Sequence, residues 1–245
     1  MKVLVVGESC RDVFNYGVCE RLCPEAPVPV FNPINVVEND GMAMNVKNNI
    51  NSIGAIKAEI FTNPNWRSVR KTRFIDHRTN HMFMRLDEND NKIKRCKLSK
   101  INFKNYDAVV ISDYNKGYVT EEDIKYISSE NDLVFLDTKK MLDPAWCSDI
   151  SYIKINSLEY NKTEHLLNDD IKKKFIITYG QDGAKHNGIL YPVPRVEIKD
   201  VSGAGDTFLA GLVTKFMQTK DISESIRFAN ECATRVVQSR GVSVV

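Results

Sequence analysis

The sequence lacks several features that mark particular classes of protein. Its 245 residues include six cysteines but no C-x-x-C pair, so neither a zinc knuckle nor a disulfide framework is indicated, and we expect reduced thiols. Residues 1–6 contain only four consecutive apolar side chains, too few for a signal-peptide core or a membrane span. We therefore expect a cytoplasmic protein without a membrane partner.

An excess of charge of either sign is also missing. The 34 Lys and Arg residues are matched by 32 Asp and Glu residues, for a formal net charge of +2. Proteins that bind a phosphate backbone usually carry a strongly basic surface, so we expect no nucleic-acid partner. A small anionic substrate is compatible with this balance.

Two common phosphate-binding signatures are absent. Residues 3–7 look like the first strand of a dinucleotide-binding fold, but residues 8–12 supply no further glycine for a G-x-G-x-x-G turn. No Walker A sequence ending in Gly-Lys-Ser/Thr occurs anywhere in the chain. These absences exclude a dinucleotide-dependent oxidoreductase and a P-loop kinase.

Short β-branched runs recur along the chain and indicate a parallel α/β sheet. They are nearly continuous in apolar character, as expected for strands buried on both faces, and helix-like stretches follow most of them. The runs cover residues 3–6, 108–111, 133–136, 152–155 and 175–178. A capping box at 120–123 predicts a helix that extends to about residue 129, and residues 42–53 predict another that ends at Gly54.

Two segments break this rhythm and predict a lid. Residues 27–38 are extended and contain prolines, and residues 71–87 form two extended arms around a polar turn at 77–80. We expect a small antiparallel sheet, built from about 13–38 and 71–87, as part of a single domain covering 1–245. Its exposed edge could pair with the lid of a second copy in a homodimer, or be covered within the chain.

The sharpest chemical feature is a turn of small residues that leads into a helix. Gly203, Ala204 and Gly205 let the backbone approach a ligand closely, and the helical stretch 207–218 points its free N–H groups and positive dipole end at that space. An anion is expected there. Asp206, in the first turn, is either a carboxylate that stabilises the helix N-terminus or a general base that accepts a proton from an attacking hydroxyl.

Two more polar segments follow predicted strands. One comprises Asn156, Ser157, Leu158 and Glu159, and the other contains Thr178, Gly180 and Gly183. Taken alone, the first could be only an N-cap with its capping box, and the second a plain turn. All three segments nevertheless lie at the carboxyl ends of predicted parallel strands, where open α/β sheets bind their ligands.

Together these segments resemble the ATP-binding half of the ribokinase-like (PfkB) carbohydrate kinases. The resemblance rests on Asn156-x-x-Glu159, Thr178-x-Gly180-x-x-Gly183 and Gly203-Ala204-Gly205-Asp206, in that order. In the amino-terminal half, the Pro-Glu-Ala-Pro-Val-Pro run within 21–30, together with segments 53–55, 85–87 and 112–117, is similar to the heptose 7-phosphate kinases of this family. The resemblance implies a ribokinase-like α/β fold, a mostly parallel sheet flanked by helices with a small antiparallel β lid.

The resemblance further implies transfer of the γ-phosphate of ATP to the anomeric hydroxyl of D-glycero-β-D-manno-heptose 7-phosphate. Asp206 would be the base, with the amides of Gly203, Ala204 and Gly205 as the anion hole. The ATP phosphates and Mg²⁺ would be held by Asn156, Ser157, Leu158 and Glu159, with Glu159 at the metal, and the nucleotide by Thr178, Gly180, Gly183 and Asn230. The sugar would meet Asp12, Gly41 and Asn45, and further substrate-binding candidates are Arg85, Asp113 and Lys116, with Arg21 as another candidate for the 7-phosphate.

Three departures from the family pattern leave alternatives open. Met42 stands where a second glycine is usual, and Lys154-Ile155-Asn156 replaces Thr-Pro-Asn. Between residues 55 and 70, only one short strand-like segment and a link remain of the usual strand, helix and strand. The alternatives are a kinase for another sugar or sugar phosphate, and a non-catalytic protein that binds nucleotide or sugar phosphate.

Overall fold

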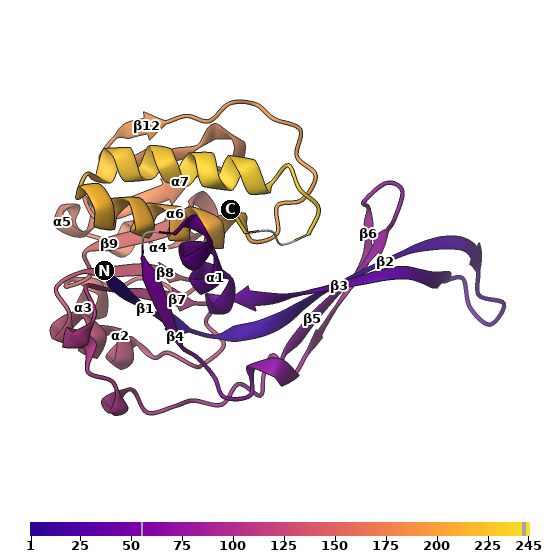
Figure 1. Ribbon diagram of the computed structural model, residues 1–245, viewed down its shortest axis with the longest axis horizontal. Helices are drawn as coiled ribbons and strands as arrows, with labels where there is room; N and C mark the ends of the chain where they lie inside the picture. The colour runs from indigo at the N-terminus through magenta and orange to yellow at the C-terminus, as the bar shows by residue number, and fades with distance from the viewer. Residues whose placement is uncertain (55, 242–243) are drawn as a thin grey trace.

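The computed structural model describes residues 1–54, 56–241 and 244–245, so Ala55, the last residue of the 53–55 segment, lies outside the described residues. The larger of its two sheets has eight strands in the order β12-β11-β10-β9-β8-β7-β1-β4 (Figure 1). Their bounds are β1 Lys2–Gly7, β4 Lys57–Phe61, β7 Ala108–Asp113, β8 Val134–Thr138, β9 Tyr152–Asn156, β10 Phe175–Thr178, β11 Ala184–His186 and β12 Ile189–Tyr191. All pairings from β4 to β10 are parallel, and β11 and β12 are added antiparallel. The mostly parallel α/β sheet expected from the sequence is therefore confirmed.

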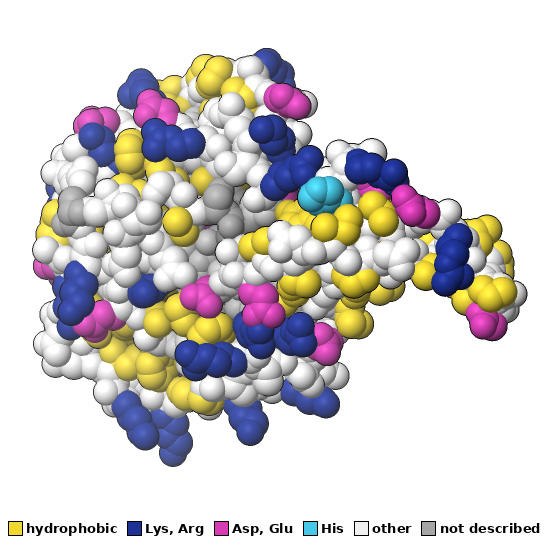
Figure 2. All heavy atoms as spheres, turned by 45° about the vertical axis from the view of Figure 1, so that its right-hand side comes forward, with side chains coloured by type: hydrophobic (Ala, Val, Ile, Leu, Met, Phe, Trp, Pro, Cys, Tyr) yellow, Lys and Arg dark blue, Asp and Glu magenta, His cyan; other side chains and the backbone are white. Residues whose placement is uncertain are grey.

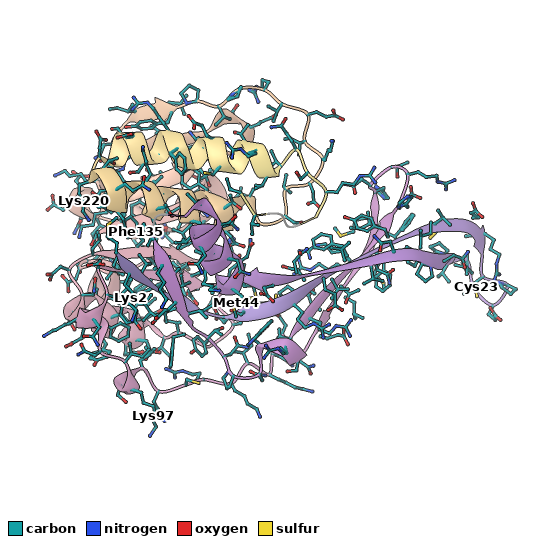
Figure 3. All side chains as sticks on the ribbon, viewed as in Figure 1. Lys2, Cys23, Met44, Lys97, Phe135 and Lys220 are labelled. Atoms are coloured by element: carbon teal, nitrogen blue, oxygen red, sulfur yellow. The ribbon has the colours of Figure 1, made fainter. Side chains whose placement is uncertain are left out.

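Helices cover both faces of this sheet (Figure 1). Successive residues of each strand face opposite sides, so the apolar strands present a hydrophobic surface on each face that the helices bury. Val3 and Val5 of β1 pack in the core beneath α1 (Ala43–Ile53), α6 (Ala204–Thr219) and α7 (Ile222–Val236). Leu4 and Val6 pack in the opposite core, under α2 (Glu121–Glu130), α3 (Pro144–Cys147) and α5 (Asp169–Lys172). Phe135 of β8, labelled in Figure 3, lies in the first core against Phe216, with ring centroids 5.6 Å apart.

Local capping sets where the helices begin and end. Thr120 accepts a hydrogen bond from Asp123 N–H and Asp123 accepts one from Thr120 N–H, which is the predicted capping box at the start of α2. Helix α1 ends at Gly54, with φ 80°, also as predicted. Helix α6 begins at Ala204 because Gly203, with φ 78°, turns the chain into it.

The second sheet projects from the body as a lid (Figure 1). It consists of β2 (Ser9–Leu22), β3 (Pro29–Met42), β5 (Arg70–Asp76) and β6 (Met82–Glu88), in the order β3-β2-β5-β6. The expectation of a purely antiparallel sheet is wrong at its centre, since β2 and β5 are parallel. After β3 the chain returns to the body through α1 and β4, so β5 leaves the body in the same direction as β2. Cys23, labelled in Figure 3, lies near the tip of the β2–β3 hairpin.

The edge of the large sheet at β4 is short. Residues 62–69 lead from β4 to the lid with one 3₁₀ turn, η1 (Trp66–Ser68), and no strand of the described chain lies beyond β4. Charged side chains occupy this edge, since Glu59 lies 3.2 Å from Lys2 Nζ and 3.7 Å from Lys57 Nζ. Such charges discourage pairing of an exposed edge strand with another chain.

The remaining short elements connect these layers. They are α4 (Ser157–Thr163) and the 3₁₀ turns η2 (Leu98–Lys100), η3 (Phe103–Asn105), η4 (Glu164–Leu166) and η5 (Gly180–Asp182). All six cysteines are free thiols, as expected. Across the described residues, no helix is both long and apolar enough to cross a membrane.

Candidate active site

Asp206 lies at the centre of the site, in the first turn of α6. Its Oδ2 accepts a hydrogen bond from Asn45 Nδ2 at 3.0 Å and its Oδ1 accepts one from the Tyr114 hydroxyl at 2.6 Å. Burial raises the pKa of Asp206 to about 6, because the charged form loses hydration, and the two hydrogen bonds act in the opposite direction. A buried carboxyl group with this pKa is suited to accept a proton near neutral pH.

Two cavities meet at the turn that carries Asp206. Gly203 and Asp206 line a cavity of about 430 Å³ beneath the lid, whereas Ala204 and Gly205 line one of about 210 Å³ on the other side. We call these the lid cavity and the body cavity. The first helical turn of α6 thus lies between the two cavities, and its N-terminus favours negative charge there.

The body cavity lies between the segments after β10 and the helices α6 and α7. Its walls are largely apolar, and it contains four of the residues expected at the nucleotide, Thr178, Gly180, Gly183 and Asn230. Gly183 has φ 93°, and a Cβ there would overlap the carbonyl oxygen of Tyr191. Asn230 Nδ2 donates to the same carbonyl at 2.8 Å, which joins α7 to the end of β12.

At the β9–α4 junction, the Asn156 segment forms a complete capping box. Asn156 Oδ1 accepts from Glu159 N–H, and Glu159 Oε2 accepts from Asn156 N–H, both at 2.9 Å. The other Glu159 oxygen contacts Lys139 Nζ. Ser157 is half-buried, whereas Leu158 is exposed. The capping box uses Glu159 Oε2, so Oε1 is the oxygen that could bind a metal cation in place of the Lys139 ammonium.

Basic side chains make up much of the lining of the lid cavity. The pairing register of β2 with β5 explains why some of them face it. In the lid sheet, Asp12 of β2 stands beside Lys71 of β5, and Phe14 beside Arg73, so these side chains share the face toward the body. The lining comprises Asp12, Met42, Lys71, Arg73, Arg85, Tyr114, Lys116, Lys139, Gly203 and Asp206. An anionic ligand fits such a cavity.

Each of these cations has a carboxylate partner. Arg73 Nη1 lies 2.5 Å from Asp12 Oδ1, and Arg85 Nε lies 2.7 Å from Asp87 Oδ1. Asp90 holds two lysines, with Lys71 Nζ at 2.5 Å and Lys116 Nζ at 2.6 Å. The cations are held in place before any ligand arrives.

The other residues that the sequence suggested for sugar binding do not line the lid cavity. Gly41 lies where a Cβ would overlap Asp12 Oδ2, so its lack of a side chain makes room for that carboxylate. Asn45 contacts Asp206 rather than lining the cavity. Asp113 is buried, accepts from the Thr138 hydroxyl at 2.5 Å and pairs with Lys140 at 2.8 Å, and is not among the lining residues. Arg21 is exposed on β2 and likewise does not line the cavity.

Sequence reasoning missed four lining residues, Lys71, Arg73, Tyr114 and Lys139. Lys71 and Arg73 carry a weak signal, because their spacing of two on a predicted strand places both on one face. Tyr114 and Lys139 follow strands at the carboxyl edge of the sheet, but nothing in their local sequence shows that they reach Asp206 or Glu159.

Two of the residues that depart from the family pattern, Met42 and Lys154, lie at this site. Met42 lines the lid cavity and has φ 61° and ψ −133°, a conformation that strains any residue with a side chain. Lys154 is buried under α6, with Nζ 2.7 Å from Asp137 Oδ2. It also lies 3.1 Å from where a Gly205 Cβ would be, which places a cation under the first turn of α6.

Ala204 N–H donates to the carbonyl of Val201 at 3.2 Å, so this member of the expected anion hole is engaged within the turn.

A family model for the pfkB family carbohydrate kinases matches residues 71–244. The chain belongs to the PfkB family of carbohydrate kinases. It is therefore a phosphotransferase of a family that phosphorylates carbohydrates with ATP.

Two bacterial relatives of this PfkB kinase carry the name bifunctional protein HldE. The Helicobacter pylori strain J99 protein is 29% identical over 297 aligned positions, and the Campylobacter curvus protein is 27% identical over 296. Both alignments cover 98% of this chain, but only 63% and 62% of the relatives. The alignments are longer than the chain, so the relatives contain residues that it lacks.

Solved structures share the ribokinase-like fold. A nucleoside kinase from Methanocaldococcus jannaschii superposes with a TM-score of 0.72 at 17% identity, covering 98% of this chain and 93% of that one. The Arabidopsis thaliana ribokinase, solved with ribose and ATP, has a TM-score of 0.69 at 13% identity, covering 98% and 93%. The ribokinase-like fold expected from the sequence is thereby confirmed.

Proposed function

We propose that this PfkB kinase transfers the γ-phosphoryl group of ATP to the anomeric hydroxyl of D-glycero-β-D-manno-heptose 7-phosphate, a step of ADP-heptose biosynthesis in the cytoplasm. The observation that carries the proposal is the position of Asp206 between a cation-rich cavity and an apolar one. The relatedness to HldE proteins supports the choice of sugar.

Asp206 acts as the general base in this proposal. The sugar occupies the lid cavity with its anomeric hydroxyl at the carboxylate, and ATP extends from the body cavity to the N-terminus of α6. The carboxylate accepts the hydroxyl proton as the oxygen attacks the γ-phosphorus and the bond to the ADP oxygen breaks. The helix N-terminus stabilises charge on the transferring group, which is the main requirement of phosphoryl transfer.

The paired cations of the lid cavity would bind the 7-phosphate. Lys71 and Lys116 share Asp90, so an arriving phosphate can take up either ammonium while Asp90 keeps the other. Arg85 offers a planar guanidinium that can bind a phosphate through two N–H groups.

Mg²⁺ fits this site as an ion that arrives with the nucleotide. No cluster of three or more His, Cys, Asp or Glu residues in the described part of the chain could hold a metal ion by itself. Magnesium at kinase sites commonly uses one or two carboxylates and the substrate phosphates, and in this proposal Glu159 would supply one by releasing Lys139. Once bound, the ion would neutralise phosphate charge.

The outer face of the lid supports a homodimer. Figure 2 shows apolar side chains gathered on the lid, where Val36 of β3 and Met82, Met84 and Leu86 of β6 are all exposed. Exposed apolar patches of this kind mark association surfaces. Sedimentation of the wild type and of Met84→Glu tests this. A dimer that the substitution dissociates is expected, and a wild type that remains a monomer at all concentrations contradicts it.

The deciding experiment measures ATP consumption by the purified protein with the heptose 7-phosphate and with a panel of other sugars and sugar phosphates. The wild type should turn over the heptose 7-phosphate, and Asp206→Asn should lose roughly 10²–10⁴-fold in kcat. Asp149→Asn, at an exposed carboxylate remote from the site, is the matched control and should keep full activity.

The other outcomes separate the alternatives. Turnover confined to a different sugar phosphate would replace the substrate but keep the chemistry. The side chain of Met42 in the lid cavity is the observation that favours this second candidate. Nucleotide binding without turnover of any panel member would instead indicate a non-catalytic relative.

A further inference from the structure

The turn after β7 is held by a carboxylate that the proposed chemistry does not use. Glu8, at the end of β1, is fully buried. Its Oε2 accepts from Tyr114 N–H and its Oε1 accepts from Lys116 N–H, both at 2.9 Å, and Oε1 lies 3.4 Å from Tyr118 N. A buried carboxylate whose hydrogen bonds all go to one turn fixes the backbone of that turn, because any movement would leave it unsatisfied.

The same turn delivers a hydroxyl to the proposed base. Tyr114 donates to Asp206 Oδ1 at 2.6 Å, although the two residues are 92 positions apart. Burial raises the pKa of the Tyr114 phenol well above its usual value, and the nearby Asp206 charge adds to this. The phenol therefore stays protonated and remains a donor toward Asp206.

The turn also connects to the lid. Lys116 Nζ lies 2.6 Å from Asp90 Oδ2, and Asp90 Oδ1 lies 2.5 Å from Lys71 Nζ of β5. One short segment thus contacts Asp206 through Tyr114 and the cations of the lid cavity through Lys116. A turn that only linked two elements of the fold would not need contacts to both Asp206 and the lid cavity.

We propose that Tyr114 is a positioning residue that fixes the orientation of the Asp206 carboxylate and keeps it ionised, with Glu8 setting the place of Tyr114. The inference rests on the proposed role of Asp206 as base. A hydrogen bond donated to a carboxylate stabilises its charged form, and it matters most where burial has removed water.

The other groups facing Asp206 do not replace this hydroxyl. Asn45 of α1 donates to the other oxygen, Oδ2. Lys154 of β9 favours the ionised form by its charge, whereas Asp137 of β8 opposes it. From the lid side, Asp12 lines the same cavity, and Cys10 is buried with its pKa raised by burial, so it stays a neutral thiol.

The test is a direct titration of Asp206 by ¹³C NMR of the carboxyl-labelled, full-length protein. Asp206→Asn identifies the resonance by its loss. In Tyr114→Phe the midpoint is expected about one pH unit higher than in the wild type, because one charge-assisted hydrogen bond is lost. Tyr126→Phe, which removes an exposed phenol on α2, is the matched control and should leave the midpoint unchanged.

A kinetic measurement should show the same shift in the Asp206 pKa, as a change in kcat/KM on the acidic side of its pH profile. Tyr114→Phe should lose about fivefold at pH 6 and recover most of that loss at pH 8, since higher pH restores the ionised base. A loss caused only by altered packing would not recover with pH. Glu8→Gln should move the midpoint in the same direction by less, and supplies a second reading if Tyr114→Phe does not fold.

An unchanged Asp206 midpoint in both folded variants would overturn the inference. The titration needs no turnover, so it stands apart from the proposed function. If no sugar is phosphorylated but the midpoint shifts, the substrate proposal fails and the positioning role of Tyr114 holds.

Discussion

Asn45 Nδ2 donates a hydrogen bond to Asp206 Oδ2 at 3.0 Å, which joins two helices whose residues are 161 positions apart. Asn45 lies on α1, directly after the lid strand β3, and Asp206 lies on α6 and lines the lid cavity. The hydrogen bond therefore ties the proposed base to the helix that follows the lid. A carboxylate that is buried and held in this way makes stability depend on pH.

The stability of the wild type relative to Asp206→Asn should fall as pH rises from 4 to 7. The folded protein keeps the Asp206 proton up to a pKa of about 6, whereas the unfolded chain loses it near 3.8, so the folded state binds more protons across this interval. The difference in free energy of unfolding should change by about 2 kcal/mol in favour of the variant. Urea unfolding at several pH values measures it, and a difference that does not vary with pH would contradict the raised pKa.

Met42 should tolerate glycine better than alanine. Alanine loses the buried side chain and keeps the strain of φ 61° and ψ −133°, whereas glycine loses the side chain and relieves the strain. Met42→Gly should therefore be about 1 kcal/mol more stable than Met42→Ala, the reverse of the usual order. Urea unfolding of the two variants decides this. Both should enlarge the lid cavity, and the KM for sugar phosphates reports that change.

Gly183→Ala should weaken ATP binding and destabilise the fold. A Cβ there would overlap the Tyr191 carbonyl that Asn230 also contacts, so the wall of the body cavity must shift. We expect a loss of about 3 kcal/mol in unfolding free energy and a higher KM for ATP. Gly188→Ala is the control, because Gly188 has a similar φ of 80° but open space around it. Equal effects of the two substitutions would show that only backbone strain matters.

Lys154→Met should destabilise the protein, because it leaves the Asp137 carboxylate buried without its partner. Removing one member of a buried ion pair costs about 3–5 kcal/mol, and Lys154→Met with Asp137→Leu should recover much of it. Thermal unfolding of the single and double variants measures the difference. Lys173→Met, which breaks the exposed pair with Asp170, is the control and should have no measurable effect. A double variant no more stable than Lys154→Met would contradict the pairing.

Features encoded within a few neighbouring residues could be predicted from the sequence. The β-branched runs became the parallel strands β1 and β7 to β10, and Thr120 with Asp123 became the capping box of α2. The small residues 203–205 became the turn into α6. In each case the preference comes from backbone sterics or hydrogen bonds that span one turn or one strand.

Features that depend on convergence of distant segments were decided by the tertiary fold. The parallel pairing of β2 with β5 follows from the return of the chain through the body, which no local pattern records. Tyr114 reaches Asp206 because Glu8 holds its turn, and Lys71 and Arg73 reach the lid cavity because the lid presents that face to the body. Asp113, which we expected at the substrate, pairs with Lys140 and does not line the lid cavity. The sequence alone determined the strands, the helix caps and the turn into α6, whereas the charges around the proposed base depend on distances between segments that only folding brings together.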